Sequence, residues 1–156
     1  MNILILYDTA FGNTGQVAQA IGSALEDRGS VQVLKVSEAS LADLQGVDVL
    51  IAGSPTQAFQ PLKGLTAFLK SIPPGGLKGM RAAAFDTRVD VQAVGSGFLT
   101  LMVKLFGYAA EPISRMLKSK GAEILLQPEG FFVLDKEGPL KDGEMERAAG
   151  WARQIS

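Results

Sequence analysis

The 156-residue sequence contains neither cysteine nor histidine. Disulfides, thiol nucleophiles, histidine general bases, Ser/His/Asp triads and ordinary zinc sites are therefore excluded. The chain also lacks a strong charge of either sign: its formal net charge is -1. Because nucleic acids select a basic surface, this balance argues against a nucleic-acid partner. We expect no metal site and no catalytic side chain of the excluded kinds.

Long apolar runs are missing too, since none reaches the roughly 18 residues of a membrane span. The N-terminus begins directly in a strand pattern, without a basic leader or a cleavage signal. A composition of 47% hydrophobic and 20% charged residues is typical of a globular chain. We expect a cytoplasmic protein with a single domain over residues 1–156 and no membrane span.

What the sequence does contain is an alternation of apolar runs with helical patterns. Strands are predicted over 2–7, 31–36, 47–54 and 80–86, with a fifth strand in two pieces on either side of Pro128. Helices are predicted over 14–28, from Leu62 to before Pro73, over 111–120, and after Asp142 as N-cap, the last with Met145, Ala148, Ala149, Ala152 and Ile155 on its buried face. This order predicts an α/β fold, a doubly wound five-stranded parallel sheet with helices on both faces. In such sheets ligands bind beyond the carboxyl ends of the strands, which here means the loops after Tyr7, Ser54 and Asp86.

The first of these loops, "YDTAFGNTGQ" over 7–16, contains no lysine or arginine. It lacks the lysine of a nucleotide P-loop and the spacing of a dinucleotide fingerprint. It offers instead the hydroxyl and amide groups of Thr9, Asn13 and Thr14, with Gly12 letting the backbone pass close to a ligand. A helix N-terminus with such groups can hold a phosphate through aligned dipoles. The alternative is an ordinary strand–helix turn with Thr14 as a simple cap.

Three segments resemble the flavodoxin family over the whole chain, in its short-chain type. "TAFGNT" (9–14) resembles the flavodoxin phosphate loop, "AGSPTQAF" (52–59) resembles its flavin loop, and "AAFDTR" (83–88) stands where its second flavin loop begins. The resemblance implies strand order 2-1-3-4-5 and bound FMN. The residues that it implies for the phosphate are Thr9, Ala10, Phe11, Gly12, Asn13 and Thr14. Those that it implies beside the isoalloxazine ring are Ser54, Pro55, Thr56, Gln57, Ala58, Phe59, Asp86, Thr87 and Arg88.

The flavin loops differ from the usual flavodoxin pattern. Phe59 is the sole aromatic residue of the second loop, and no glycine stands between Ser54 and Lys63 to take up a positive φ at low energy. Arg88 has two interpretations. It could lie near the ring and favour the anionic reduced flavin, or be a surface residue paired with Asp86 or Asp90.

The segment 97–109, "GFLTLMVKLFGYA", is apolar almost all round a helix. A surface helix of this fold should be apolar on one side only. The segment is either buried by neighbouring loops, a lid over the flavin, or a subunit interface, and a homodimer through 98–108 is possible.

The resemblance implies a flavoprotein of electron transport, in the broad class of oxidoreductases. We favour an electron carrier that acts on redox partner proteins or a small acceptor. One alternative is a small FMN-dependent reductase of quinone-like acceptors, and another is a non-redox flavin-binding interaction module. No residue of the protein itself is predicted to be catalytic.

Overall fold

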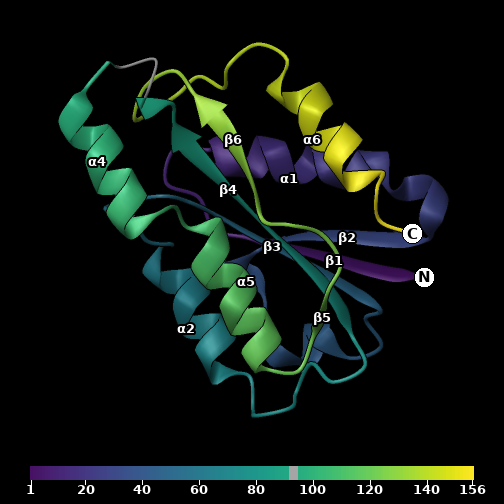
Figure 1. The fold of residues 1–156 in the computed structure, drawn as a ribbon. Coiled ribbons are helices and arrows are strands. Elements are labelled where there is room, and N and C mark those ends of the chain that lie inside the picture. Colours follow the sequence, from purple (N-terminus) through teal and green to yellow (C-terminus); the bar gives the residue numbers. More distant parts are fainter. Residues whose placement is uncertain (92–94) are drawn as a thin grey trace.

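The computed structural model describes residues 1–91 and 95–156, and its centre is a parallel sheet (Figure 1). The strands are β1 (Asn2–Tyr7), β2 (Ser30–Lys35), β3 (Val49–Pro55), β4 (Arg81–Val89), β5 (Glu123–Ile124) and β6 (Glu129–Val133). Their order is β2-β1-β3-β4-β5, with β6 also paired to β4, and every strand pairing is parallel. The predicted order 2-1-3-4-5 is therefore confirmed.

The fifth position of the sheet is filled by two short strands in succession. β5 pairs with the start of β4 at Arg81 and Ala82, and β6 pairs with its end from Phe85 to Val89. Pro128, which has no N–H to donate to a ladder, lies between the two. The predicted division of this strand is confirmed, and β6 carries the chain on to the carboxyl edge of the sheet.

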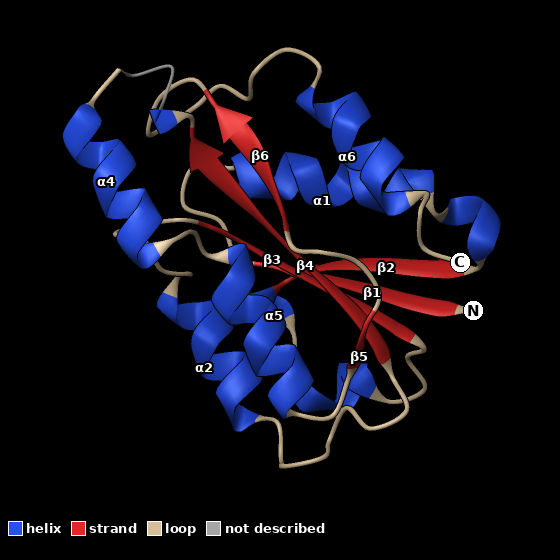
Figure 2. Ribbon diagram, in the orientation of Figure 1, coloured by secondary structure: helices blue, strands red, loops and turns tan. Residues whose placement is uncertain are grey.

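Helices cover both faces of the sheet (Figure 2). α1 (Asn13–Ala24) and α6 (Glu144–Ala152) lie on one face, and α2 (Lys63–Ser71) and α5 (Ala110–Ser119) lie on the other. Short 3₁₀ segments occupy Glu26–Arg28, Val36–Glu38 and Leu41–Leu44. α4 (Gly97–Phe106) projects beside the carboxyl ends of the strands and has no buried residue. Within the described ranges, no helix is long and apolar enough to cross a bilayer.

Two apolar cores result because successive side chains of a strand point to opposite faces. Ile3 and Ile5 pack under α1 and α6, whereas Leu4 and Leu6 pack under α2 and α5. Burial on both faces explains why β1 reads as a continuous apolar run. The first core also contains a cluster of three rings, Phe85, Phe131 and Trp151, with centroids 6.1 to 6.3 Å apart.

The last helix departs from its predicted start and face. Its N-cap is Gly143, at φ 86°, and not Asp142. Glu144 turns inward, where its carboxylate accepts a hydrogen bond from the Phe132 amide at 2.7 Å. This contact sets the rotation of the helix, so Met145 is exposed and Trp151 is buried.

Candidate functional site

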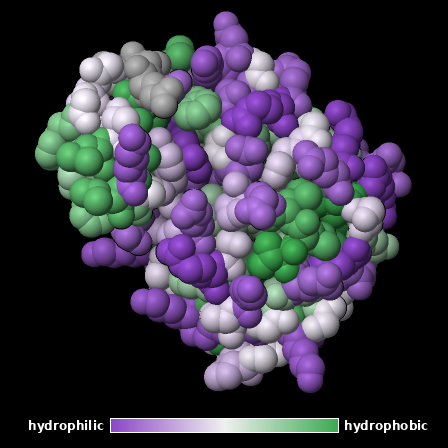
Figure 3. Space-filling view, viewed as in Figure 1, coloured by the Kyte–Doolittle hydropathy of each residue, from purple (hydrophilic) through white to green (hydrophobic). Residues whose placement is uncertain are grey.

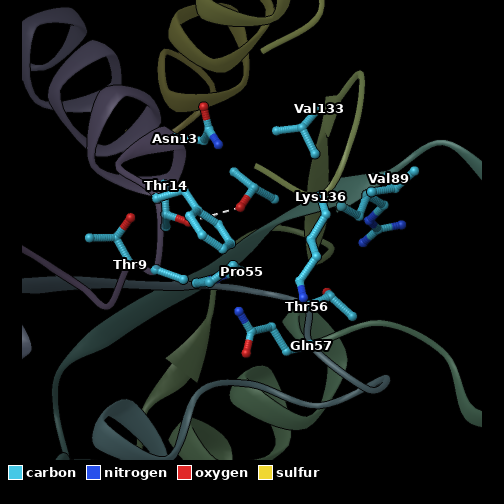
Figure 4. A pocket seen from close by; sticks show the side chains of 13 residues that line it. Thr9, Asn13, Thr14, Pro55, Thr56, Gln57, Val89, Val133 and Lys136 are labelled. Atoms are coloured by element: carbon cyan, nitrogen blue, oxygen red, sulfur yellow. Dashed lines mark hydrogen bonds between the residues drawn. The ribbon is translucent and has the colours of Figure 1, made fainter. Parts of the chain in front are cut away.

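A pocket opens at the carboxyl ends of β1, β3, β4 and β6, between the loops that follow them (Figure 4). Its lining residues are Thr9, Ala10, Phe11, Asn13, Thr14, Pro55, Thr56, Gln57, Thr87, Arg88, Val89, Val133 and Lys136. The pocket thus lies at the switch in strand order, where the doubly wound fold places ligands.

The N-terminus of α1 presents unused amides to this pocket. Its N-cap is Gly12, at φ 94°, and no side chain caps the helix. The first helical hydrogen bond runs from the Gln16 amide to the Gly12 carbonyl at 3.1 Å. The amides of Asn13, Thr14 and Gly15 precede that bond, so they have no acceptor within the helix. The interpretation of Thr14 as a simple cap is therefore wrong.

Threonine hydroxyls complete the set of donors. Thr9 Oγ1 accepts a hydrogen bond from the Gly12 amide at 2.9 Å and keeps its own hydrogen to donate. The hydroxyls of Thr14 and Thr87 lie 2.8 Å apart in a buried pair that ties α1 to β4 (Figure 4). Dipolar amides with neutral hydroxyls suit a phosphate, because the positive end of a helix dipole favours an anion.

Asp8, the nearest carboxylate along the chain, is engaged at the other side of the loop. Its Oδ1 accepts from the Thr9 amide at 2.9 Å, and its Oδ2 accepts from the Leu65 amide at 3.2 Å. Leu65 belongs to the first turn of α2, whose dipole also favours a negative charge. These contacts compensate the carboxylate charge that would otherwise weaken anion binding.

The loop after β3 is held by its own polar groups. Ser54 Oγ donates to the Pro55 carbonyl and accepts from the Leu62 amide, both at 2.9 Å. Thr56 Oγ1 accepts from the Ala109 amide at 2.9 Å, and the Thr56 amide donates to the Thr87 carbonyl at 2.9 Å. The mouth of the pocket is thus connected to β4 and to the start of α5.

A tight turn at Ala58 and Phe59 ends this loop. Gln57 and Gln60 exchange two backbone hydrogen bonds of 2.9 Å, and the residues between them have φ values of 48° and 66°. Such a turn normally takes glycine or asparagine. Phe59 is oriented by the turn so that its ring lies 5.6 Å from that of Phe106 on α4.

The strain in this turn is testable with Ala58→Gly. We expect the variant to raise the free energy of unfolding by about 0.5–1 kcal/mol, because glycine adopts positive φ without a steric penalty. Ala67→Gly, at an exposed position inside α2, should instead lower that free energy by about 1 kcal/mol. Urea denaturation of both variants measures the difference, and a loss in both would contradict a strained turn.

β4 contributes a buried ion pair below the pocket. Arg88 donates to Asp86 through Nε at 2.7 Å and through Nη2 at 2.6 Å, and the Ala110 amide donates to the same carboxylate at 2.9 Å. The Asp86 side chain is fully buried, and that of Arg88 is 17% exposed. Burial raises the pKa of Asp86, and the two hydrogen-bond donors offset part of that effect.

Arg88 is enclosed on two further sides. Its guanidinium carbon lies 3.6 Å from the centroid of the Tyr108 ring. Its Nε occupies the space that a Cβ on residue 130 would need, and Gly130 has no Cβ. Of the interpretations that the sequence left open for Arg88, the structure shows pairing with Asp86. Arg88 nevertheless still lines the pocket.

Most residues predicted for the site come together. The pocket is lined by Thr9, Ala10, Phe11, Asn13, Thr14, Pro55, Thr56, Gln57, Thr87 and Arg88. The predicted residues outside this lining are Gly12, Ser54, Ala58, Phe59 and Asp86, which shape the loops or support Arg88. Sequence reasoning missed Val89, Val133 and Lys136. The rule that ligands bind at the carboxyl ends of strands could have indicated Lys136, because it follows the predicted fifth strand.

Comparison with known proteins matches this architecture. No curated protein matches the chain by sequence. Oxidised flavodoxin 1 from Bacillus cereus superposes with a TM-score of 0.77 at 16% identity, over 99% of this chain and 96% of that one. A flavodoxin from the domain Archaea superposes with a TM-score of 0.74 at 22% identity, over 99% of this chain and 96% of that one. Rubredoxin oxygen:oxidoreductase from Desulfovibrio gigas superposes with a TM-score of 0.73 at 18% identity. The present chain spans only 35% of the length of that protein.

These structural likenesses concern the fold, and the family follows from the sequence itself. The profile of the flavodoxin family matches residues 5–151. FMN is the cofactor of that family, and the uncapped amides and hydroxyls at α1 are of the kind that its phosphate requires. The chain belongs to the flavodoxin family.

Proposed function

We propose that the protein is an electron carrier that works through FMN bound in the pocket at the carboxyl ends of the strands. The observation that carries the proposal is the N-terminus of α1, whose amides are left without a side-chain cap beside a pocket formed by the β3 and β4 loops. FMN supplies one- and two-electron transfer, and the protein supplies binding, orientation and electrostatics.

The proposed binding mode places the two ends of FMN in different parts of the pocket. Its phosphate would be held by the amides of Asn13 and Thr14 and by the Thr9 hydroxyl. Its ring would lie between the loops after β3 and β4, near Thr56 and Arg88.

The phosphate end is tested by comparing FMN with riboflavin. Thr9→Ala should weaken FMN binding tenfold to a hundredfold, because it removes the hydroxyl that would donate to the phosphate, and a charge-assisted hydrogen bond contributes roughly 1.5–3 kcal/mol. Riboflavin, which has no phosphate, should bind both proteins equally and less tightly than FMN. Quenching of flavin fluorescence on addition to the apoprotein gives the affinities. Equal affinity of the wild-type protein for the two flavins would refute the phosphate site.

The ion pair of Arg88 favours the carrier over the reductase. A free cation beside the ring would stabilise an anionic reduced flavin and raise its second potential. Here Asp86 neutralises Arg88 in a bidentate contact, so that effect is reduced. An anaerobic reductive titration of the FMN-loaded protein distinguishes the roles. Two separated one-electron steps with a low second potential support a carrier, and a single two-electron step supports a reductase of quinone-like acceptors.

We place the protein in the cytoplasm as one domain over residues 1–156, with redox proteins or a small acceptor as its partners. α4 leaves an apolar surface uncovered, because its Phe98, Leu101, Leu105 and Phe106 are each more than half exposed. Figure 3 shows apolar residues gathered over this helix. We call these four residues the α4 patch.

A second copy of the chain is the occupant that we propose for the α4 patch. A two-fold axis would bring the patch against itself, so apolar side chains would cover one another. The net charge of -1 produces little repulsion between copies. The wild-type protein should then sediment as a dimer at tens of micromolar, and Leu101→Glu with Leu105→Glu should give a folded monomer. A wild-type monomer at that concentration would rule the dimer out.

A further inference from the structure

The loop after β6, residues 134–143, lies against the N-terminus of α1. It is closed by hydrogen bonds of 2.9 Å from the Leu134 amide to the Pro139 carbonyl and from the Lys141 amide to the Phe132 carbonyl. Asn13 Nδ2 donates to the Glu137 carbonyl at 3.1 Å, which joins the loop to the first residue of α1. The backbone on either side of Lys136 is therefore held next to the anion site.

The side chain of Lys136 extends from this loop across the pocket. In Figure 4 its stem runs from the β6 side, and its ammonium group lies toward Thr56. Its amide donates to Asp135 Oδ1 at 2.7 Å, but within the described part of the chain Lys136 takes part in no ion pair. The ammonium group is thus available to a ligand.

Arg88 is the other cation among the described residues of the pocket lining, and it is already engaged. Both of its bonded nitrogens donate to Asp86, which also fixes the direction of the guanidinium. Lysine carries its charge on a flexible stem and can follow a phosphate, whereas a clamped guanidinium cannot. The two pocket cations therefore differ in what they can do.

We infer that Lys136 pairs with the phosphate of the bound flavin and supplies the positive charge that the phosphate loop itself lacks. This inference rests on the proposed FMN site. The amides and hydroxyls at α1 orient the phosphate. The flexible stem of Lys136 then turns its ammonium group from the Thr56 side of the pocket toward the N-terminus of α1, beside which the loop backbone is held. The charge comes from a loop more than a hundred residues later in the chain.

The test measures FMN and riboflavin affinities of Lys136→Gln at low ionic strength. Lys141→Gln is the matched control: this lysine is in the same loop, but its Nζ lies 5.9 Å over the Phe132 ring and it does not line the pocket. We expect Lys136→Gln to bind FMN about fivefold to tenfold more weakly and riboflavin with unchanged affinity. Lys141→Gln should bind both as the wild type does. The difference for FMN should shrink at about 0.5 M salt, where charges are screened.

Two results would overturn the inference while leaving the FMN site intact. In the first, the wild type prefers FMN to riboflavin and Lys136→Gln shows the same preference. In the second, Lys136→Gln loses equal affinity for both flavins, which would place Lys136 at the ring. A wild type that binds neither flavin would instead refute the proposed function. Lys136→Arg keeps the charge and should retain most of the FMN affinity, and far-UV circular dichroism checks that each variant is folded.

Discussion

Arg88→Met is expected to lower the free energy of unfolding by about 3–5 kcal/mol at neutral pH. The substitution keeps an unbranched side chain against Tyr108 but removes the cation from Asp86, which has no exposure to water. Breaking a buried ion pair by removing one partner leaves an uncompensated charge, and losses of this size are typical. Denaturation by urea, followed by circular dichroism, measures the difference.

The pH dependence of that loss identifies its cause. Burial raises the pKa of Asp86 already in the wild type, and removing Arg88 should raise this pKa further. The stability of the variant should therefore fall more steeply with rising pH than that of the wild type, and the two should converge toward about pH 4. Adding Asp86→Asn should recover part of the loss at neutral pH. A loss below about 1 kcal/mol at every pH would mean that Asp86 is neutral in the native protein.

Gly130→Ala should cause a comparable loss, on the order of 3 kcal/mol, although it adds only a methyl group. The three atoms nearest to the new Cβ all belong to Arg88, and the closest, Nε, would lie 2.0 Å away. Since Asp86 fixes the guanidinium from the other side, Arg88 can yield only by breaking its hydrogen bonds. Thermal unfolding of the single variant gives the size of the effect.

A double-mutant cycle separates this clash from any effect on the strand. Arg88→Ala removes the three atoms nearest to the added Cβ, so Gly130→Ala should cost much less in that background than in the wild type. Gly150→Ala serves as the control, because its Cβ would meet nothing within 4 Å. Equal losses in the wild-type and Arg88→Ala backgrounds would show that Gly130 is needed for another reason.

The sequence predicted the sheet well because a strand buried on both faces carries its own signal. Runs such as 2–7 and 47–54 are apolar without alternation, and β1 and β3 were found there. The start of α6 was predicted less well. Asp142 is a good N-cap by residue type, but the contact of Glu144 with the Phe132 amide moves the helix start to Gly143. That contact joins residues from different elements and leaves no local pattern.

In the site, too, features that depend on neighbouring residues could be predicted, and features that depend on contacts between distant segments could not. The place of the segment from Thr9 to Thr14 at the pocket could be predicted, since it is one short segment directly after one strand. The pairing of Arg88 remained open, because Asp86 and Asp90 are both two residues away and only burial distinguishes them. Lys136 follows the predicted fifth strand, but no local pattern shows that it lines the pocket, since its position depends on the path of residues 134–143 past Asn13.

The ring cluster of Phe85, Phe131 and Trp151 has a spectroscopic consequence. Trp151 is the single tryptophan of the chain, and it is buried in the core under α1 and α6. Its emission therefore follows the melting of that half of the molecule, whereas far-UV circular dichroism follows the whole backbone. Coincident midpoints from the two signals would mean that the halves on either side of the sheet unfold as one cooperative unit. An earlier midpoint in the tryptophan emission would mean that the half beneath α1 opens first, and with it the pocket wall formed by Thr9 to Thr14.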